Sequence, residues 1–309
     1  MNKNNKDNND KENTKSINKD YSDWIKAGEI ASKVREFSKT IIKPGARLID
    51  VADQIELKIR ELGAISAFPV NLSHDSFAAH CTPISEDETV LDKQLLKVDI
   101  GVCYNGAIGD TAYTVDFSGN HAKLVEASKK AVENALKILK IGTTLGEIGK
   151  VIEDTITGYG FQPIRNLSGH GLDLFKIHTA PTVPNYDTKD NTMLEKGMII
   201  AIEPFATTGG GRIRDTTHAE IFMKISDKPI RDVFARTVFE EIKTFEGLPF
   251  SRRALAKKFP LPRLNLALRQ LILNGNLQEY PPLQEVNQGM VSQHEHTLLI
   301  EDEVIVLTK

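Results

Sequence analysis

Apolar residues recur at helical spacing in three stretches of the first 160 residues, which predicts three amphipathic helices. The first helix starts at Ser22, a residue type that often caps helix N-termini. The second follows a Pro44-Gly45 turn and ends at Gly63, and the third lies between two further glycines. The apolar faces consist, in order, of Trp24, Ala27, Ile30 and Val34; Leu48, Val51, Ile55, Ile59 and Leu62; and Leu145, Ile148, Ile152 and Ile156.

The second and third helical stretches repeat one pattern at an offset of 97 residues. Gly45, Leu48, Val51, Ile55, Ile59 and Gly63 are matched one for one by Gly142, Leu145, Ile148, Ile152, Ile156 and Gly160. The strand-like run 95–100 is answered by 199–204, which sets Asp99 against Glu203. This spacing is too long for a solenoid repeat. We therefore expect two α/β halves packed about a pseudo-twofold axis, where acidic residues from both halves meet.

Two aspartates occupy strand positions where apolar residues are expected. Residues 95–116 read as a hairpin with an Asn-Gly turn, and they place Asp99 and Asp110 on neighbouring strands. A buried, unpaired carboxylate costs several kcal/mol or more, so the pair should share a cation or a proton. The alternative for each aspartate is a turn cap or a single arginine partner.

Several histidines are candidates for the same site. His170 lies between two glycines, which allow close approach of backbone or ligand. His80 precedes Thr-Pro much as His178 precedes Thr-Ala-Pro, so we favour these two and leave His74 to the surface. In the last apolar run, 290–308, alternation puts Glu295 on one face and its two histidine neighbours on the other. Spacing alone does not decide which face carries chemistry.

Two segments stand apart from the duplicated pattern. Residues 1–20 are mostly Asn, Lys and Asp, and we expect a disordered polar tail there. Residues 233–285 have their own helical periodicity, and six Lys or Arg but no acidic residue occur between 250 and 278. This composition indicates a helix-turn-helix-like insertion, in which a solvated structural face is favoured over a nucleic-acid contact. The triple glycine 209–211 lacks the ending of a phosphate loop and is interpreted as a flexible connection.

Composition narrows the class of protein. The chain has 309 residues, 40% of them hydrophobic, and a net charge of -3, which does not favour binding to nucleic acid or to a membrane surface by the whole chain. We find no apolar run of about 18 residues and expect no signal peptide. Two cysteines, Cys81 and Cys103, exclude a disulfide framework. We therefore expect a cytoplasmic protein.

The chain resembles the methionine aminopeptidases over residues 21–309. The similarity is carried by AFPVNLS, AAHCTP, KVDIGV, GDTAYTVD, SGHGL, IHTAPTVPN, AIEPFAT, GLPF and HEHTLLI. The basic insertion resembles that of the type 2 enzymes, and the short N-terminal segment resembles the archaeal form. The resemblance implies the α/β (α+β) pita-bread fold, a duplicated catalytic domain over 21–309 with a winged-helix-like insertion at 233–285.

The resemblance also implies a metal centre. Its ligands would be Asp99, Asp110, His170, Glu203 and Glu295, with Asp110 and Glu295 bridging two divalent cations. Four carboxylates and one histidine suit Mn²⁺, Fe²⁺ or Co²⁺, and Zn²⁺ is also compatible. His294 stands where relatives carry Phe, so we expect it close to the metals, with a slight effect on metal affinity.

By the same resemblance, a hydroxide that bridges the metals attacks the first peptide bond and releases the N-terminal methionine. Glu203 would move the proton, His178 would donate to the oxyanion, and His80 would contact the scissile amide. Phe68 and Ile177 would line the methionine pocket, although ordinary core packing explains both residues nearly as well. The partners would be N-termini of nascent polypeptides, with neither membrane nor DNA, and the protein would act as a monomer.

Two other functions fit parts of the sequence. A pita-bread module that binds RNA or protein without peptidase activity would explain the basic insertion, but the five filled ligand positions argue against it. A prolidase or Xaa-Pro aminopeptidase would need a large N-terminal domain, for which the chain has no room. A combined hypothesis is an active enzyme that docks near ribosomal RNA through Arg252, Arg253, Lys257 and Lys258.

Overall fold

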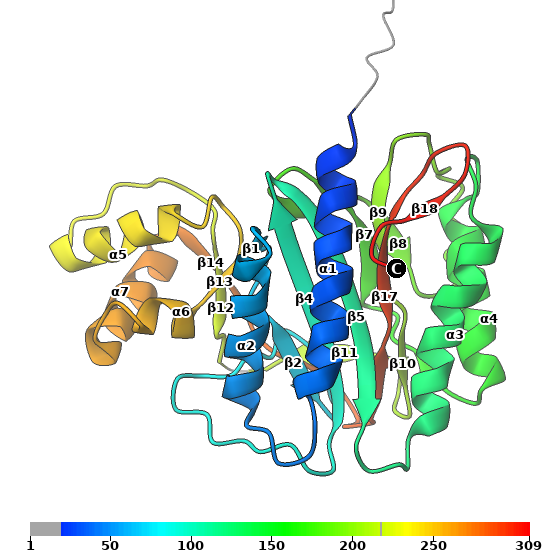
Figure 1. Cartoon of the computed structure of the whole chain (residues 1–309), viewed down its shortest axis with the longest axis horizontal. Helices are drawn as coiled ribbons and strands as arrows, with labels where there is room; N and C mark the ends of the chain where they lie inside the picture. The colour runs from blue at the N-terminus through cyan, green and yellow to red at the C-terminus, as the bar shows by residue number, and fades with distance from the viewer. Residues whose placement is uncertain (1–19, 217) are drawn as a thin grey trace, which may run out of the picture.

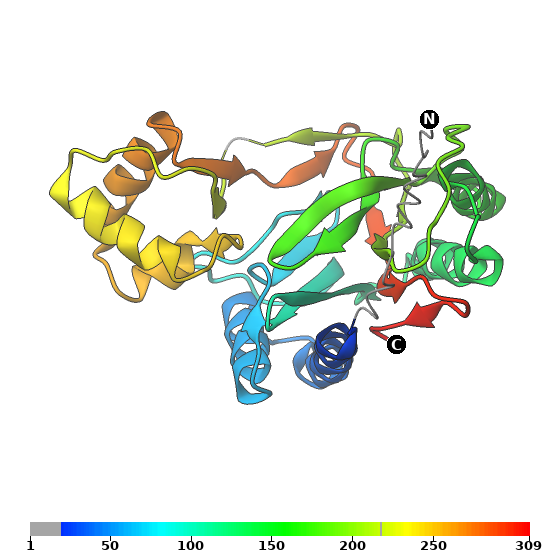
Figure 2. The same cartoon turned by 90° about the horizontal axis from the view of Figure 1, so that it is seen from above.

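The centre of the protein is an antiparallel nine-stranded sheet (Figures 1 and 2). The computed structural model describes residues 20–216 and 218–309, so the predicted tail lies outside the described residues except for Asp20. Along the sheet the strands are β1 (Ile65–Ser66), β4 (Leu95–Tyr104), β5 (Ala107–Asp116), β17 (Glu295–Leu299), β9 (Ile199–Ile202), β7 (Ser168–Asp173) and β8 (Lys176–Pro184). β2 (Asn71–His74) pairs with β4, and β18 (Ile305–Val306) pairs with β17.

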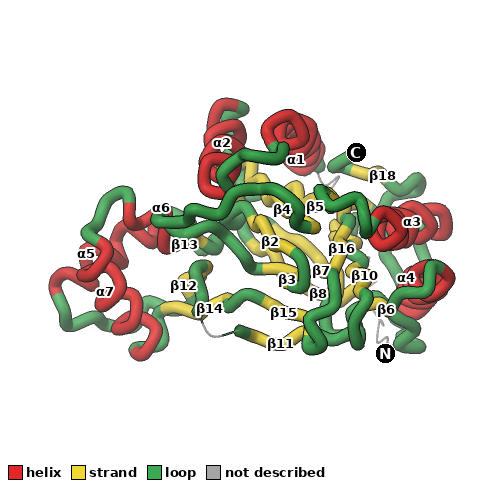
Figure 3. The backbone as a smooth tube through the Cα atoms, turned by 90° about the horizontal axis from the view of Figure 1, so that it is seen from below, coloured by secondary structure: helices red, strands yellow, loops and turns green. Residues whose placement is uncertain are grey.

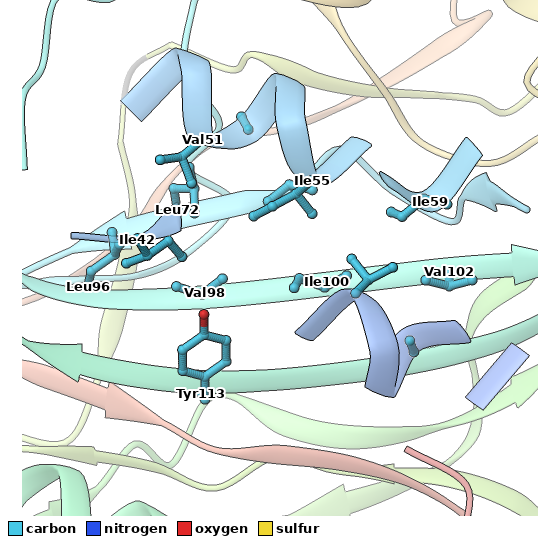
Figure 4. Close-up of a cluster of buried hydrophobic side chains, with 14 of the residues drawn as sticks. Ile42, Val51, Ile55, Ile59, Leu72, Leu96, Val98, Ile100, Val102 and Tyr113 are labelled. Carbon is cyan, nitrogen blue, oxygen red and sulfur yellow. The ribbon is translucent and has the colours of Figure 1, made fainter. Parts of the chain in front are cut away.

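Four helices flank this sheet in two pairs: α1 (Ser22–Ile41) with α2 (Leu48–Glu61), and α3 (Ala122–Ile138) with α4 (Leu145–Gly158) (Figure 1). The apolar faces of α1, α2 and α4 are buried, as predicted from the periodicity, and α3 is a helix that the sequence analysis did not predict. In the first half, Val51 and Ile55 of α2 lie against Val98 and Ile100 of β4 (Figure 4). One detail was wrong: Ser22 does not cap α1 with its side chain, and its backbone N–H instead donates to Asp20 (2.9 Å).

The internal duplication is visible in matching hydrogen bonds before the second helix of each half. The N–H of Gly45 donates to Leu91 O (2.7 Å), and the N–H of Gly142 donates to Leu194 O (2.8 Å). The helix starts repeat as well, because Leu48 N bonds to Thr89 O and Leu145 N to Thr192 O, both at 2.9 Å. All four turn glycines of the repeat have φ between 81° and 89°, where a side chain would be strained.

The predicted hairpin is formed by β4 and β5, which pair from Leu95↔Asp116 to Tyr104↔Ala107. Its turn residues Asn105 and Gly106 have φ of 51° and 90°, as a type I′ turn requires. The two aspartates therefore lie on adjacent, centrally placed strands.

A smaller unit projects from one end of the molecule (Figures 2 and 3). It contains α5 (Val233–Lys243), α6 (Arg252–Ala256) and α7 (Leu261–Leu273) over the three-stranded sheet β13 (Phe250–Ser251), β12 (Ile221–Lys224) and β14 (Leu277–Tyr280). The unit has its own apolar core, in which Phe222 and Phe250 of the sheet meet Leu264, Leu268 and Leu271 of α7. β12 precedes residue 233, so the sheet draws on chain outside the span that periodicity marked.

The remaining strands form two small sheets beside the central one (Figure 3). Their strands are β16 (Val291–Gln293), β10 (Phe205–Thr207) and β6 (Gln162–Pro163), and β11 (Ile213–Asp215), β15 (Leu283–Glu285) and β3 (Phe77–Ala79). The triple glycine between β10 and β11 is not a loose connection. Gly210 N–H donates to the buried Glu285 carboxylate (2.7 Å), and a side chain at Gly209 would lie 2.3 Å from that carboxylate.

The four basic residues expected to dock on RNA are all engaged with acidic partners. Arg252 Nε donates to Glu220 (2.9 Å), Lys257 contacts Asp53 (3.0 Å) and Lys258 contacts Glu241 (2.6 Å). Arg253 is buried between carboxylates of α2. These four residues therefore offer no unpaired basic surface. No helix in the described ranges is long and apolar enough to cross a membrane.

Candidate metal centre

Five adjacent strands of the central sheet each bring one predicted ligand to the same region. In their order across the sheet these are Asp99 on β4, Asp110 on β5, Glu295 on β17, Glu203 directly after β9, and His170 on β7. Asp99 and Glu295 both lie opposite Ala112, whose methyl group leaves room for two carboxylates. Residues far apart in the sequence thus converge because their strands are neighbours.

The predicted ligands lie within reach of one another. One ligand atom each from Asp110, His170 and Glu295 falls within 4.8 Å of the other two. His170 Nε2 is 3.4 Å from Glu203 Oε1 and 3.9 Å from Asp110 Oδ2. Asp99 joins this cluster through an amide: Gln293 Nε2 donates to Asp99 Oδ2 (3.5 Å), Glu203 Oε2 (3.4 Å) and Glu295 Oε2 (3.5 Å).

The cluster favours protonated acids when no cation is bound. Burial raises the pKa of Asp99 to about 7. Burial, followed by repulsion from the neighbouring carboxylates, raises the pKa of Asp110, Glu203 and Glu295 well above that of free acids. Burial also lowers the pKa of His170 to about 3, so its imidazole is neutral and able to bind a metal.

The donor set fits divalent cations. Asp99 Oδ1, Asp110 Oδ1 and Glu295 Oε1 are buried acceptors without a hydrogen-bond partner. In the described part of the chain, none of the four carboxylates forms an ion pair with Lys or Arg. Buried acceptors of this kind are normally paired or bound to metal, and carboxylate-rich sites suit hard cations.

A cavity of about 260 Å³ opens onto the cluster, and all four predicted substrate-binding residues line it: Phe68, His80, Ile177 and His178. Phe68 and Ile177 are buried and belong to one apolar cluster. The ring of Phe68 occupies the space beside Gly101, where an added Cβ would lie 2.2 Å from it. The cavity therefore has an apolar side beside its acidic floor.

The two predicted catalytic histidines, His80 and His178, both line this cavity. The His178 ring contacts the His170 ring edge to face, with centroids 4.5 Å apart, and burial lowers the pKa of His178. His80 has φ of 61°, and its Nδ1 lies 3.2 Å from Pro281 O. Burial lowers the pKa of His80 to about 4, so this imidazole is neutral at physiological pH. His74 is part exposed beside Asp75 and does not line the cavity, as expected.

The placement of His294 differs from the prediction. Its ring lies 5.9 Å from that of His296, on the face of the sheet opposite the carboxylates, and both rings lie near Arg35 of α1. His296 Nδ1 contacts Thr308 Oγ1 (3.0 Å). Strand alternation explains the difference, because a residue adjacent to Glu295 must point away from the cluster. The His294 side chain therefore points away from the predicted metal ligands, and of the two faces of this strand it is the one with Glu295 that faces the cluster.

The sequence analysis did not single out Gln293, which contacts the carboxylates, or Asn71 and Tyr280, which line the cavity. Gln293 lies two positions before Glu295, so alternation alone could have placed it on the ligand face. Asn71 lies opposite Asp99 in the β2–β4 register, and its Oδ1 is buried without a partner. Tyr280 comes from the end of the projecting unit, and no periodic signal marked it.

Comparison with known proteins identifies the family. The model of metallopeptidase family M24 matches residues 24–221. The chain belongs to metallopeptidase family M24. It is 47% identical over 287 residues to a methionine aminopeptidase of Thermococcus onnurineus, an alignment that covers 92% of this chain and 97% of the relative.

Solved structures extend this result to the fold. A methionine aminopeptidase of Thermotoga maritima superposes with a TM-score of 0.67 at 23% identity, covering 93% of this chain and 95% of that chain. A thermophilic Arx1 gives a TM-score of 0.79 at 17% identity, covering 92% and 89%. At such identities the similarity concerns the fold, and it confirms the pita-bread fold of this M24 member.

The cysteines, Cys81 and Cys103, are both free.

Proposed function

We propose that this M24 metallopeptidase removes the N-terminal methionine from polypeptides. The observation that carries the proposal is the convergence of four carboxylates and one neutral histidine from neighbouring strands at the floor of a half-apolar cavity. Relatives named methionine aminopeptidase, similar over nearly their whole length, support this substrate.

We propose two divalent cations as cofactors, with Mn²⁺, Fe²⁺ or Co²⁺ as the preferred ions and Zn²⁺ as a further compatible one. Asp110 and Glu295 would be shared between them, Asp99 would hold one, and His170 and Glu203 would hold the other. Such cations supply a water of lowered pKa as nucleophile and an electrophile for the carbonyl oxygen. The unpartnered oxygens of Asp99, Asp110 and Glu295 support this assignment.

The chain's own groups account for the proton transfers. Glu203 accepts a proton from the attacking water and returns it to the leaving amine, a role supported by its place in the cavity beside His170, whose Nε2 lies 3.4 Å from Glu203 Oε1. His178 donates to the developing oxyanion, and a donor of this kind contributes about 3 to 4 kcal/mol. Neutral His80 contacts the scissile amide. Phe68 and Ile177 enclose the unbranched thioether.

The biological setting belongs to the same proposal. The substrates are N-termini of nascent polypeptides, and the protein acts in the cytoplasm as a monomer. A ribosome contact through the projecting unit would need basic residues other than the four that are ion-paired. Arg269 on the exposed side of α7 is one such residue.

The test is release of free methionine from Met-Ala-Ser by metal-stripped protein before and after addition of Mn²⁺, Fe²⁺ or Co²⁺. Peptides that begin with Pro or Xaa-Pro serve as controls. We expect metal-dependent release of methionine alone. Cleavage of the Xaa-Pro peptide instead would identify a prolidase, and inactivity of the folded protein with every metal would favour a binding module.

A further inference from the structure

A buried arginine connects the projecting unit to the metal-bearing sheet. The Arg253 side chain on α6 is 3% exposed, and its guanidinium pairs with two carboxylates of α2. Nη2 donates to Glu56 (2.7 Å) and Nη1 to Asp53. A buried cation normally needs such partners. The two negative charges of Asp53 and Glu56 balance the two positive charges of Arg253 and Lys257, which also contacts Asp53. The apolar face of α2 belongs to the same hydrophobic cluster as β4, the strand of Asp99 (Figure 4).

The third nitrogen of the same guanidinium, Nε, faces the loop that carries His80. Arg253 Nε donates to the backbone carbonyl of Pro83 (3.2 Å), three residues after His80. That loop is also held by the bond from Leu72 N to Cys81 O (2.6 Å). A lysine has no planar fork and could not serve three acceptors in fixed directions.

His80 itself depends on contacts with the end of the projecting unit. Its backbone is in the left-handed region, with φ of 61°, a conformation that surrounding contacts must maintain. Its ring packs edge to face on Tyr280, with centroids 5.6 Å apart, and Nδ1 lies 3.2 Å from Pro281 O. A shift of the projecting unit relative to α2 would therefore move the ring of His80 as well as its loop.

We propose that Arg253 is a positioning residue for catalysis: it fixes the projecting unit and the His80 loop to α2, and so sets where His80 stands relative to the carboxylate cluster. This inference rests on the proposed role of His80. It assigns the projecting unit a function in the reaction itself, apart from any role in binding a partner.

The test begins with Arg253→Met, which keeps length and removes all three hydrogen bonds, and with Arg253→Lys. We expect kcat on Met-Ala-Ser to fall by up to about 100-fold for Arg253→Met, the loss that a displacement of about 1 Å of a catalytic group can cause. KM and metal stoichiometry should change little, and Arg253→Lys should recover part of kcat. Arg252→Met is the matched control, because Arg252 pairs with Glu220 inside the projecting unit. It should retain kcat within about twofold.

A double-mutant cycle with His80→Ala separates positioning from general damage. If Arg253 acts through His80, Arg253→Met should lower kcat little further in the His80→Ala protein. An equal fold loss in both backgrounds would overturn the inference while leaving the proposed peptidase intact. If His80→Ala alone keeps full kcat, His80 has no catalytic role, and the inference about Arg253 is overturned with it. Should Arg253→Met not fold, the cycle is run with Glu56→Gln, which removes one charge partner, and the same outcomes apply.

Discussion

At the scale of single residues, the backbone of Asp110 is hydrogen-bonded while one oxygen of its carboxylate has no partner. Its N–H donates to Thr297 Oγ1 (2.8 Å), and the same hydroxyl donates to Asp110 O (2.8 Å), so the residue is fastened on both sides to the strand of Glu295. In its side chain, Oδ1 is buried without a hydrogen-bond partner. The fold satisfies the polar backbone of Asp110 and leaves the carboxylate available for a cation.

Asp110→Asn should therefore abolish turnover with little change in fold. The amide keeps the shape but removes one negative charge from a position proposed to contact both cations. We expect the rate of methionine release to fall by more than about 100-fold, beyond the usual loss for groups that only orient ligands. Bound metal per subunit, measured by elemental analysis, should also fall. Full activity with a full complement of metal would contradict the ligand assignment.

Gln293 is the second residue with a specific expectation, because its amide touches three of the four carboxylates. Gln293→Met keeps the length but removes the donor that orients these groups. We expect metal affinity to weaken by about 10- to 100-fold, measured by titration calorimetry on stripped protein. Ser292→Ala is the control, since Ser292 Oγ donates to Leu124 O, away from the cluster. Equal affinities for both variants would show that Gln293 does not orient the ligands.

At the scale of elements, the glycines around His170 set the spacing between strands. A Cβ at Gly169 would lie 2.2 Å from Ala201 O on β9, and one at Gly171 would lie 2.1 Å from Ala180 O on β8. These strands must approach closely for His170 to reach Glu203. The glycine pair that marked the site in the sequence is thus a packing requirement of β7.

Gly169→Ala should destabilise the protein and displace His170 from Glu203. Forcing a methyl group against the β9 backbone should cost about 1–3 kcal/mol of unfolding free energy. Urea unfolding measures this cost, and metal titration should show weaker binding. Gly158→Ala is the control, because nothing lies within 4 Å of a Cβ at this position of α4. An unchanged urea midpoint for Gly169→Ala would show that β9 can move away.

Periodicity and repetition predicted much of this scaffold. Local spacing of residues along the chain was enough to predict the apolar faces of α1, α2 and α4, the Asn-Gly hairpin and the duplication. The contacts that the sequence did not predict are long-range. Tyr280 reaches the cavity, Arg253 pairs with α2, and Glu285 holds the glycine loop, each through partners that sequence spacing does not reveal. For His294, the face predicted from strand alternation was right, and the expectation from the resemblance that it lies close to the metals was wrong.

At the scale of the whole molecule, the two halves meet at the carboxylates. Asp99 and Asp110 come from the first half, His170 and Glu203 from the second, and Glu295 from the returning strand β17 between them. The cluster thus brings carboxylates from both halves together in the interior of the protein. Without a cation, each ionised carboxylate there opposes the association of the halves.

Metal-stripped protein should therefore lose stability as pH rises. Burial raises the pKa of Asp99 from 3.8 to about 7. Between these two pH values the folded state binds more protons at this group than the unfolded state, so the free energy of unfolding falls as pH increases. The loss is complete above the folded pKa. Bound divalent cations take the place of the protons and remove this slope.

Thermal unfolding from pH 5 to pH 8, with and without Mn²⁺, measures the effect. The stabilisation by metal should grow with pH, because the metal-free protein weakens and ligand binding to the folded state adds to Tm. Asp99→Asn isolates the contribution of Asp99, since an amide cannot titrate, while the other three carboxyl groups of the cluster still can. The metal-free variant should lose less stability across this pH range than the metal-free parent. Parallel pH curves for these two proteins would mean that Asp99 does not hold its proton more tightly in the folded state.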